Sequence, residues 1–213
     1  MGAVPTREEF LRALAEKHGA ERQRKLRAAT VAVCGLGGLG SNVAIALARA
    51  GVGRLILIDF DRVDVSNLNR QQYLARQVGE LKAAALAENL RAIAPYTELE
   101  PHAERITEDN FASLLTGADV ICEAFDRPEA KAMLVNGVLE RFPDKHLVAA
   151  SGMAGFDSAN RISTRRVTKR FYLCGDGTSD VDDGSGLVSS RVLVCAAHEA
   201  HMIIRLLTGE TEP

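Results

Sequence analysis

The chain has 213 residues, which is enough for one sizeable hydrophobic core but short for two independent ones. Hydrophobic residues make up 46% and charged residues 25%, and the formal net charge of −2 disfavours binding to nucleic acid or to an anionic membrane. The segment 1–27 is polar, and the apolar runs are too short to cross a bilayer. We therefore expect a cytoplasmic protein that binds neither nucleic acid nor a membrane.

An N-terminal helical extension is expected over residues 1–28. Thr6 followed by Glu9 fits a capping box, which predicts a polar helix over about 7–18. The core should then run over residues 29–155, where short apolar runs alternate with amphipathic ones. The predicted strands are 30–34, 54–59, 97–103, 119–124 and 146–150, and the predicted helices are 41–50, 79–94, 107–115 and 128–141. This alternation indicates an α/β, Rossmann-like, mostly parallel sheet with helices on both faces.

The pattern changes in the last part of the chain, residues 156–213. Residues 160–173 have the mixed character of antiparallel strands, and 175–186 are rich in Asp and Gly, which predicts a mobile loop. A closing helix is expected over 187–207. Because no linker is visible, we predict one domain over residues 1–213.

A glycine-rich loop follows the first predicted core strand. Residues 35–40 match G-x-G-x-x-G, lie between a strand and a helix, and are followed by Asp59 at the end of the next strand. Gly35 allows the tight turn, Gly37 lets the backbone approach phosphate, and Gly40 allows close helix packing, while Asp59 can accept from ribose hydroxyls. This context predicts a nucleotide site.

Polar residues after the second and later strands argue for ATP rather than a dinucleotide. Arg70 and Lys82 suit the charge that builds on phosphates during nucleotidyl transfer, and Asp126 could hold Mg²⁺. Taken singly, Arg70 and Lys82 could instead form surface ion pairs. Two other functions stay open: an NAD- or FAD-dependent oxidoreductase, and a non-catalytic nucleotide-binding adaptor.

Several linked motifs resemble a known superfamily. The segments VCGLGGLGS (33–41), AGVGRLILIDFD (50–61), SNLNRQ (66–71) and GELK (79–82) are similar to those of the ThiF/MoeB/ubiquitin-activating superfamily. The resemblance covers about residues 22–155. The short length and the segments 172–177 and 186–191 are most similar to the short "family 2" ThiF proteins.

The resemblance implies ATP and Mg²⁺ as cofactors and a specific reaction. The C-terminal Gly-Gly carboxylate of a ubiquitin-like sulfur-carrier protein would be activated as an acyl-adenylate, in thiamine or related sulfur metabolism, by a homodimer. The implied cofactor-binding residues are Gly35, Gly37, Gly38, Gly40, Asp59, Asp61, Asn67, Asn69 and Gln71, and the implied catalytic residues are Arg70, Lys82 and Asp126, the last of these as the Mg²⁺ ligand.

The sequence departs from longer members of the superfamily in two ways. It has no Cys-x-x-Cys pair, so we predict no zinc site. It also lacks the Arg-Tyr-x-Arg-Gln signature whose arginine reaches the neighbouring subunit; Arg22 or Arg24 is the candidate substitute. Cys174 is a possible reactive thiol, although an inert buried thiol is the commoner outcome for a free cysteine.

Overall fold

The structure, a computed structural model, describes residues 3–180 and 186–213, in which a seven-stranded sheet has the order β3-β2-β1-β4-β5-β7-β6. The strands are β1 (Thr30–Cys34), β2 (Arg54–Ile58), β3 (Glu98–His102), β4 (Val120–Glu123), β5 (His146–Ala150), β6 (Ser163–Arg166) and β7 (Phe171–Gly175). Within the described part of the chain, β6 pairs antiparallel with β7, and the other strand pairs are parallel. The predicted Rossmann-like fold class is confirmed, and β7 proves to continue the parallel sheet beside β5.

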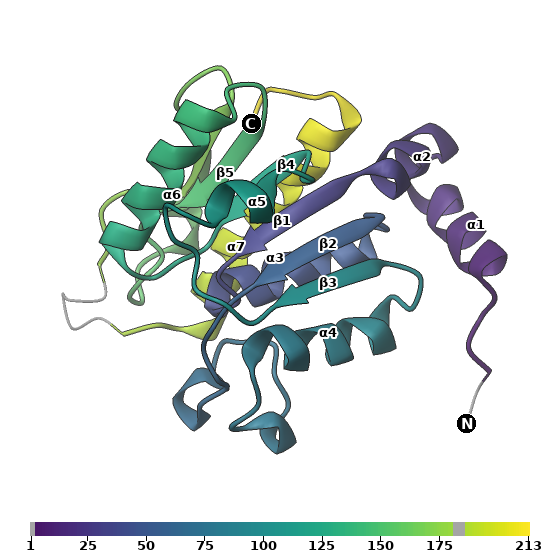
Figure 1. Ribbon diagram of the computed structural model, residues 1–213, viewed down its shortest axis with the longest axis horizontal. Coiled ribbons are helices and arrows are strands. Elements are labelled where there is room, and N and C mark those ends of the chain that lie inside the picture. Colours follow the sequence, from purple (N-terminus) through teal and green to yellow (C-terminus); the bar gives the residue numbers. More distant parts are fainter. Residues whose placement is uncertain (1–2, 181–185) are drawn as a thin grey trace.

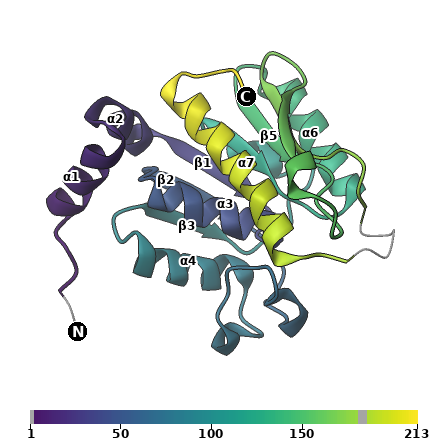
Figure 2. The same ribbon diagram turned by 180° about the vertical axis from the view of Figure 1, so that it is seen from behind.

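Helices cover both faces of this sheet. They are α1 (Arg7–His18), α2 (Ala20–Ala28), α3 (Gly38–Arg49), α4 (Lys82–Ile93), α5 (Phe111–Leu115), α6 (Pro128–Arg141) and α7 (Ser189–Thr208). In Figure 1, α5 and α6 lie in front of the sheet, and Figure 2 shows α3, α4 and α7 on the other face. The helices α1 and α2 form an arm at one side, and α1 carries the capping box expected at Thr6 and Glu9. Neither 3–180 nor 186–213 contains a helix that is both long and apolar enough to cross a membrane.

Alternating residues of the strands belong to two hydrophobic clusters, one on each face of the sheet. Val31 and Val33 of β1 point toward α3, α4 and α7, whereas Ala32 and Cys34 point toward α5 and α6. Such continuous burial of β1 is expected of a parallel strand covered on both sides. The sheet order reverses between β1 and β4, because the chain runs outward to β2 and β3 before it returns. The carboxyl ends of β1 and β4 therefore border a switch point, where ligands bind in folds of this type.

Four helices begin at other residues than the sequence predicts, and one of them, α7, begins at Ser189 rather than at 187. The helix α3 begins at Gly38 rather than at 41, because the end of the glycine loop already forms its first turn. The helix α4 begins at Lys82 rather than at 79, because Gly79 and Glu80 bond to the backbone of Val63. The helix α5 begins at Phe111, after a turn that precedes it.

Candidate nucleotide-binding site

The glycine loop between β1 and α3 is packed too tightly for side chains at two positions. Gly35 has φ +89°, and a Cβ there would lie 2.8 Å from the carbonyl oxygen of Ala124, at the end of β4. At Gly40 a Cβ would lie 1.8 Å from the carbonyl oxygen of Gly35. Gly35 therefore sets the turn, and Gly40 lets α3 approach it. The first turn of α3 leaves backbone N–H groups without acceptors inside the helix, an arrangement that attracts anions.

Asp59 connects the end of β2 to this loop. Its carboxylate accepts a hydrogen bond from the backbone N–H of Leu36 at 2.7 Å and another from that of Asp61 at 2.8 Å. Burial raises the pKa of Asp59, and the positive charge of Lys82 together with these two N–H groups opposes the rise. Each carboxylate oxygen has two acceptor lone pairs, so Asp59 can still accept from a ligand hydroxyl.

A cavity of about 510 Å³ opens at the switch point. Ten of the residues predicted from the sequence line it: Gly35, Gly37, Gly38, Asp59, Asp61, Asn67, Arg70, Gln71, Lys82 and Asp126. They come from the glycine loop, the end of β2, the segment between β2 and α4, and the end of β4. The fold thus gathers residues that lie up to 91 positions apart (35 to 126) around one space.

The two predicted cations, Arg70 and Lys82, both line this cavity and have different surroundings. Lys82 is 7% exposed, and its Nζ lies 3.4 Å from Oδ2 of Asp61. Arg70 donates to the carbonyl oxygen of Ser66 and to Oδ1 of Asn69. Burial lowers the pKa of Arg70, and the negative charge of Asp126 acts against that decrease. The negative charge of Asp126 therefore acts on Arg70, and both residues line the cavity.

Two predicted residues support the site without lining it. Gly40 contributes through its packing against Gly35. Asn69 is exposed, donates to the carbonyl oxygen of Leu187 at 3.1 Å and accepts from Arg70. It thus ties the segment before α7 to the segment that carries Arg70.

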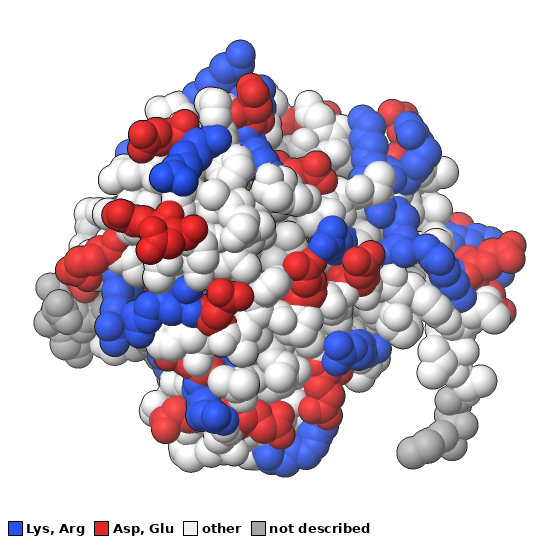
Figure 3. Space-filling model, viewed as in Figure 1, with Lys and Arg blue, Asp and Glu red and all other residues white. Residues whose placement is uncertain are grey.

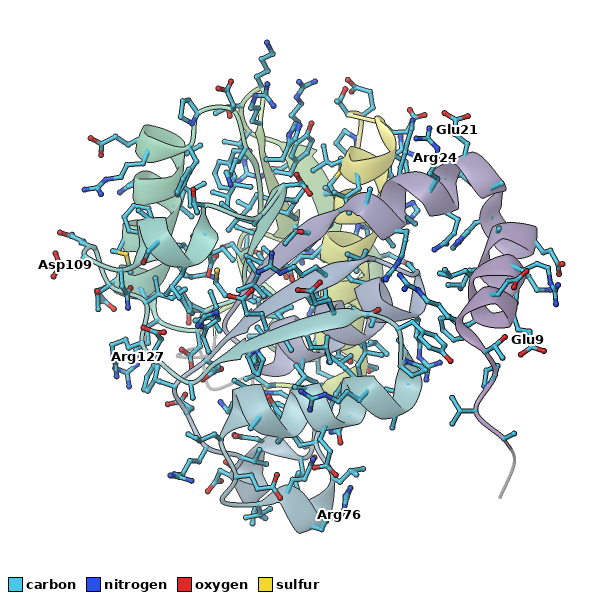
Figure 4. All side chains as sticks on the ribbon, turned by 45° about the vertical axis from the view of Figure 1, so that its right-hand side comes forward. Glu9, Glu21, Arg24, Arg76, Asp109 and Arg127 are labelled. Atoms are coloured by element: carbon cyan, nitrogen blue, oxygen red, sulfur yellow. The ribbon has the colours of Figure 1, made fainter. Side chains whose placement is uncertain are left out.

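The candidate arginine on the N-terminal arm lies far from the cavity within one chain. Figure 4 shows Arg24, on α2, and Arg127, which lines the cavity, at opposite sides of the molecule. Within one chain, Arg24 therefore does not line the cavity. On the face drawn in Figure 3, basic and acidic side chains are interleaved rather than separated.

The sequence did not single out a buried ion pair beneath the β4–α6 loop. Glu123, at the end of β4, is 1% exposed, and its carboxylate accepts from Nζ of Lys131 on α6 at 2.9 and 3.0 Å. Glu123 also accepts from the N–H of Phe125, while Lys131 donates to the carbonyl oxygen of the same residue. Both backbone groups of Phe125 are therefore held, next to Asp126.

A second buried ion pair supports the opposite wall. Arg191, on the first turn of α7, pairs with Asp176, and both side chains are 3% exposed. Arg191 also donates to the carbonyl oxygens of Ala154, Asp157 and Ser158. Burial works against the ionised form of Asp176, but N–H groups of Ser179 and Thr178 and the charge of Arg191 hold its pKa well below the ordinary value. Arg191 therefore joins three segments behind the cavity.

Glu199 of α7 is fully buried and poorly paired. Its Oε1 accepts from Sγ of Cys122 at 3.8 Å, and its Oε2 has no hydrogen-bond partner among residues 3–180 and 186–213. Burial, reinforced by the negative charge of Glu123, raises the pKa of Glu199 well above the usual value. The folded protein therefore keeps a proton on Glu199 that the unfolded chain releases above about pH 4.3.

This retained proton predicts a stability that falls as pH rises. Between the unfolded and folded pKa values of Glu199, the folded state binds more protons, so each increase in pH favours unfolding. Replacing Glu199 by Gln removes that dependence and should raise the free energy of unfolding at pH 8, with less gain toward pH 4. Urea unfolding at both pH values measures it. The exposed Glu140→Gln is the control, and equal pH slopes for wild type and Glu199→Gln would contradict the prediction.

Cys174 lies away from the main cavity. It is 0% exposed, lines a separate cavity beside β6 and β7, and contacts Oγ1 of Thr164 at 3.4 Å. Burial, with a further contribution from Glu199, raises the pKa of the Cys174 thiol to about 12. These surroundings oppose the low pKa that a reactive thiol needs.

Two other expectations concern metals and the loop before α7. Among residues 3–180 and 186–213, no group of three or more His, Cys, Asp or Glu side chains is arranged to hold a metal ion. The expected mobile loop over 175–186 lies partly outside the described residues, since 181–185 are not among them.

Comparison with curated proteins finds relatives that share part of this chain. The chain is 41% identical over 109 residues to a "Sulfur carrier protein adenylyltransferase" of Thermus thermophilus, covering 51% of the chain and 40% of that protein. It is 30% identical over 193 residues to "Adenylyltransferase and sulfurtransferase UBA4" of Lodderomyces elongisporus, covering 88% of the chain and 42% of that protein. The chain thus spans well under half the length of these relatives.

Comparison with solved structures finds the same fold over nearly the whole chain. The E. coli tRNA N6-threonylcarbamoyladenosine dehydratase TcdA in complex with ATP has a TM-score of 0.85 and 24% identity, covering 96% of this chain and 97% of that one. E. coli MccB with ATP has a TM-score of 0.74 and 21% identity, covering 98% of this chain and 66% of that one.

The family pattern described as "ThiF family" matches residues 10–213, which include every element that lines the cavity. The chain belongs to the ThiF family.

Proposed function

We propose that this protein binds ATP in the switch-point cavity and transfers its adenylyl group to a carboxylate. One observation carries the proposal. In a member of the ThiF family, a glycine loop, a carboxylate that can accept from ribose hydroxyls (Asp59) and two cations (Arg70 and Lys82) line one cavity. The same residues dispersed over the surface would carry no such argument. We also propose that residues 1–213 act as one domain.

The lining of the cavity suits a nucleotide. The glycine loop and the first turn of α3 offer N–H groups to phosphate, and Asp59 can accept from ribose hydroxyls. Gln71 is 8% exposed, and its Oε1 has no hydrogen-bond partner within the described parts of the chain. A buried acceptor without a partner is costly, so a ligand donor beside Gln71 would remove that cost.

The proposed reaction is an in-line displacement at the α-phosphorus. A carboxylate oxygen forms a bond to this phosphorus, and the bond to the oxygen that bridges the α- and β-phosphates breaks. Pyrophosphate leaves with the electron pair, and the products are an acyl-adenylate and pyrophosphate. Arg70 and Lys82 offset the negative charge that grows on the phosphates, which is the largest contribution that a preorganised site of this type makes.

Asp126 is the residue that would hold Mg²⁺. It lines the cavity at the end of β4 and supplies one carboxylate, and Mg²⁺ commonly takes one or two carboxylates together with phosphate oxygens and waters. This donor set therefore fits Mg²⁺ only in the company of ATP. When bound there, the ion would neutralise phosphate charge.

We infer that the carboxylate is the C-terminal Gly-Gly tail of a ubiquitin-like sulfur-carrier protein, in thiamine or related sulfur metabolism, and that the protein acts as a homodimer. The names of curated relatives, which include a sulfur carrier protein adenylyltransferase, support this substrate class. TcdA, a tRNA N6-threonylcarbamoyladenosine dehydratase by name, has the same fold and is named for another substrate. Mass spectrometry of each candidate small protein after incubation with ATP and this protein would test the inference, since the adenylate adds AMP to the tail.

The nucleotide preference gives a first test. Mg·ATP should raise the melting temperature, because a ligand at 100 times its dissociation constant adds about 2.7 kcal/mol to stability. NAD should raise it much less, because Arg70, Lys82 and Asp126 suit a triphosphate with its metal ion. Thermal unfolding with each ligand at equal concentration measures the difference. A larger shift with NAD would instead favour an oxidoreductase.

Catalysis is tested separately from binding. ATP–pyrophosphate exchange should occur when the accepted carrier is present and cease when its terminal glycine is deleted. Binding of Mg·ATP without exchange, for a carrier that forms a complex with the protein, would favour a non-catalytic adaptor.

A further inference from the structure

The ion pair between Glu123 and Lys131 also bonds to the backbone of Phe125, at the end of β4. Lys131 Nζ donates to both carboxylate oxygens of Glu123 and, at 2.8 Å, to the carbonyl oxygen of Phe125. These three bonds use the three donors of an ammonium group. Lys131 lines the cavity, yet it has no donor left for a ligand.

The backbone that this pair holds is the backbone that places Asp126. Glu123 Oε1 accepts from the N–H of Phe125 at 2.7 Å, so the peptide groups on both sides of Phe125 are fixed. The N–H of Ala124 bonds to the carbonyl oxygen of Cys34, which anchors the start of the loop to β1. Asp126, one residue farther on, is exposed and has no hydrogen bond or ion pair of its own within the described residues.

We propose that Glu123 and Lys131 are positioning residues that fix Asp126 for Mg²⁺ bound with ATP. This inference rests on the proposed function. Removing Lys131 leaves the buried carboxylate of Glu123 without its partner. Removing either member frees the loop, so Asp126 can adopt positions that do not face the phosphates. Residues that orient a metal ligand commonly contribute 10–100-fold to metal affinity or activity.

The experiment compares ATP affinity with Mg²⁺ and with EDTA, by isothermal titration calorimetry. In wild type, Mg²⁺ should strengthen ATP binding. In Lys131→Met the enhancement of ATP affinity by Mg²⁺ should be about tenfold smaller than in wild type, and Asp126→Asn should show the same loss. The affinity of Lys131→Met for metal-free ATP should stay within about twofold of the wild-type value. Lys131→Arg should restore most of the enhancement, because a guanidinium can donate to both acceptors.

Lys145→Met is a matched control. Lys145 also donates to three acceptors, the carbonyl oxygens of Leu115, Thr116 and Ala118, and does not line the cavity. Its loss should lower stability without changing the Mg²⁺ enhancement. If Lys131→Met does not fold, Glu123→Gln keeps one of the two acceptor oxygens while removing the charge, and it should show a smaller loss in the same ratio.

The outcomes separate this inference from the proposed function. If wild type binds ATP equally well with Mg²⁺ and with EDTA, Asp126 does not act as a Mg²⁺ ligand. The positioning role of Glu123 and Lys131 would then be overturned as well. A wild-type enhancement that Asp126→Asn abolishes but Lys131→Met and Glu123→Gln retain in full would overturn the positioning role alone. An equal loss of affinity with and without Mg²⁺ in the variants would also overturn it, because it would indicate general damage to the site.

Discussion

Replacing Arg70 or Lys82 by alanine is expected to slow ATP–pyrophosphate exchange by about 10²–10³-fold, while ATP affinity stays within about tenfold of wild type. The reason is that both cations lie where negative charge grows during the reaction, so their interactions strengthen in the transition state. Lys82 should show the larger loss, because it is 7% exposed and little water can replace its charge.

Exchange is measured with the carrier that wild type accepts, and ATP affinity is measured without it. Arg76→Ala is the control, because Arg76 lies on the same segment but pairs with Glu88 at the surface and does not line the cavity. Exchange at the wild-type rate in both alanine variants would mean that Arg70 and Lys82 act only as ion-pairing residues, and the proposed chemistry would be wrong.

The largest stability effect is expected from Arg191. Arg191→Leu leaves the buried carboxylate of Asp176 without its cation and the carbonyl oxygens of Ala154 and Asp157 without a donor. Breaking a buried pair in this way costs about 3–5 kcal/mol. Urea unfolding should show the loss as a lower midpoint, and Mg·ATP should recover part of it by binding the folded state.

An exposed pair in the same region supplies the comparison. Arg161 and Asp157 lie 2.6 Å apart, but their side chains are 57% and 54% exposed. Arg161→Leu should therefore change the free energy of unfolding by less than about 1 kcal/mol. If Arg191→Leu cost no more than Arg161→Leu, the three segments behind the cavity would be held by packing rather than by this arginine.

The local parts of the fold follow from the sequence. The helix over 128–141 and the strand over 146–150 match α6 and β5 at both ends, because Pro128 favours a helix start and the apolar run of β5 is short and bounded. The glycine loop and Asp59 were also predictable, since their spacing follows from the geometry of one βαβ unit. Their gathering around one cavity matches the expectation, and their roles toward ATP stay predictions.

The groups that sequence reasoning missed are titratable side chains that the fold buries fully or in part. Glu123, Lys131, Arg191 and Glu199 lie in stretches that read as ordinary strand or helix. Their burial depends on which helix crosses which strand, and that has no signature in local periodicity. The sequence shows that Glu123 and Lys131 are eight residues apart. Because one residue lies on a strand and the other on the following helix, this spacing alone does not predict a contact. The contact of Asn69 was not predictable for a related reason: its partner, Leu187, lies 118 residues away.

The close approach of Gly35 to Ala124 has a consequence for the order of folding. The first half of the chain can form β1, β2 and β3 with their helices from contacts between neighbouring segments, whereas pairing of β1 with β4 joins Val31 to Val120. Contacts between such distant segments form late, because closing a long loop costs chain entropy. In a partly folded chain in which β1, β2 and β3 have formed but β4 has not paired, the glycine loop would be present. Ala124 and Asp126 would not yet lie next to it. A newly made chain therefore gains the nucleotide cavity only when its second half has been added to the sheet.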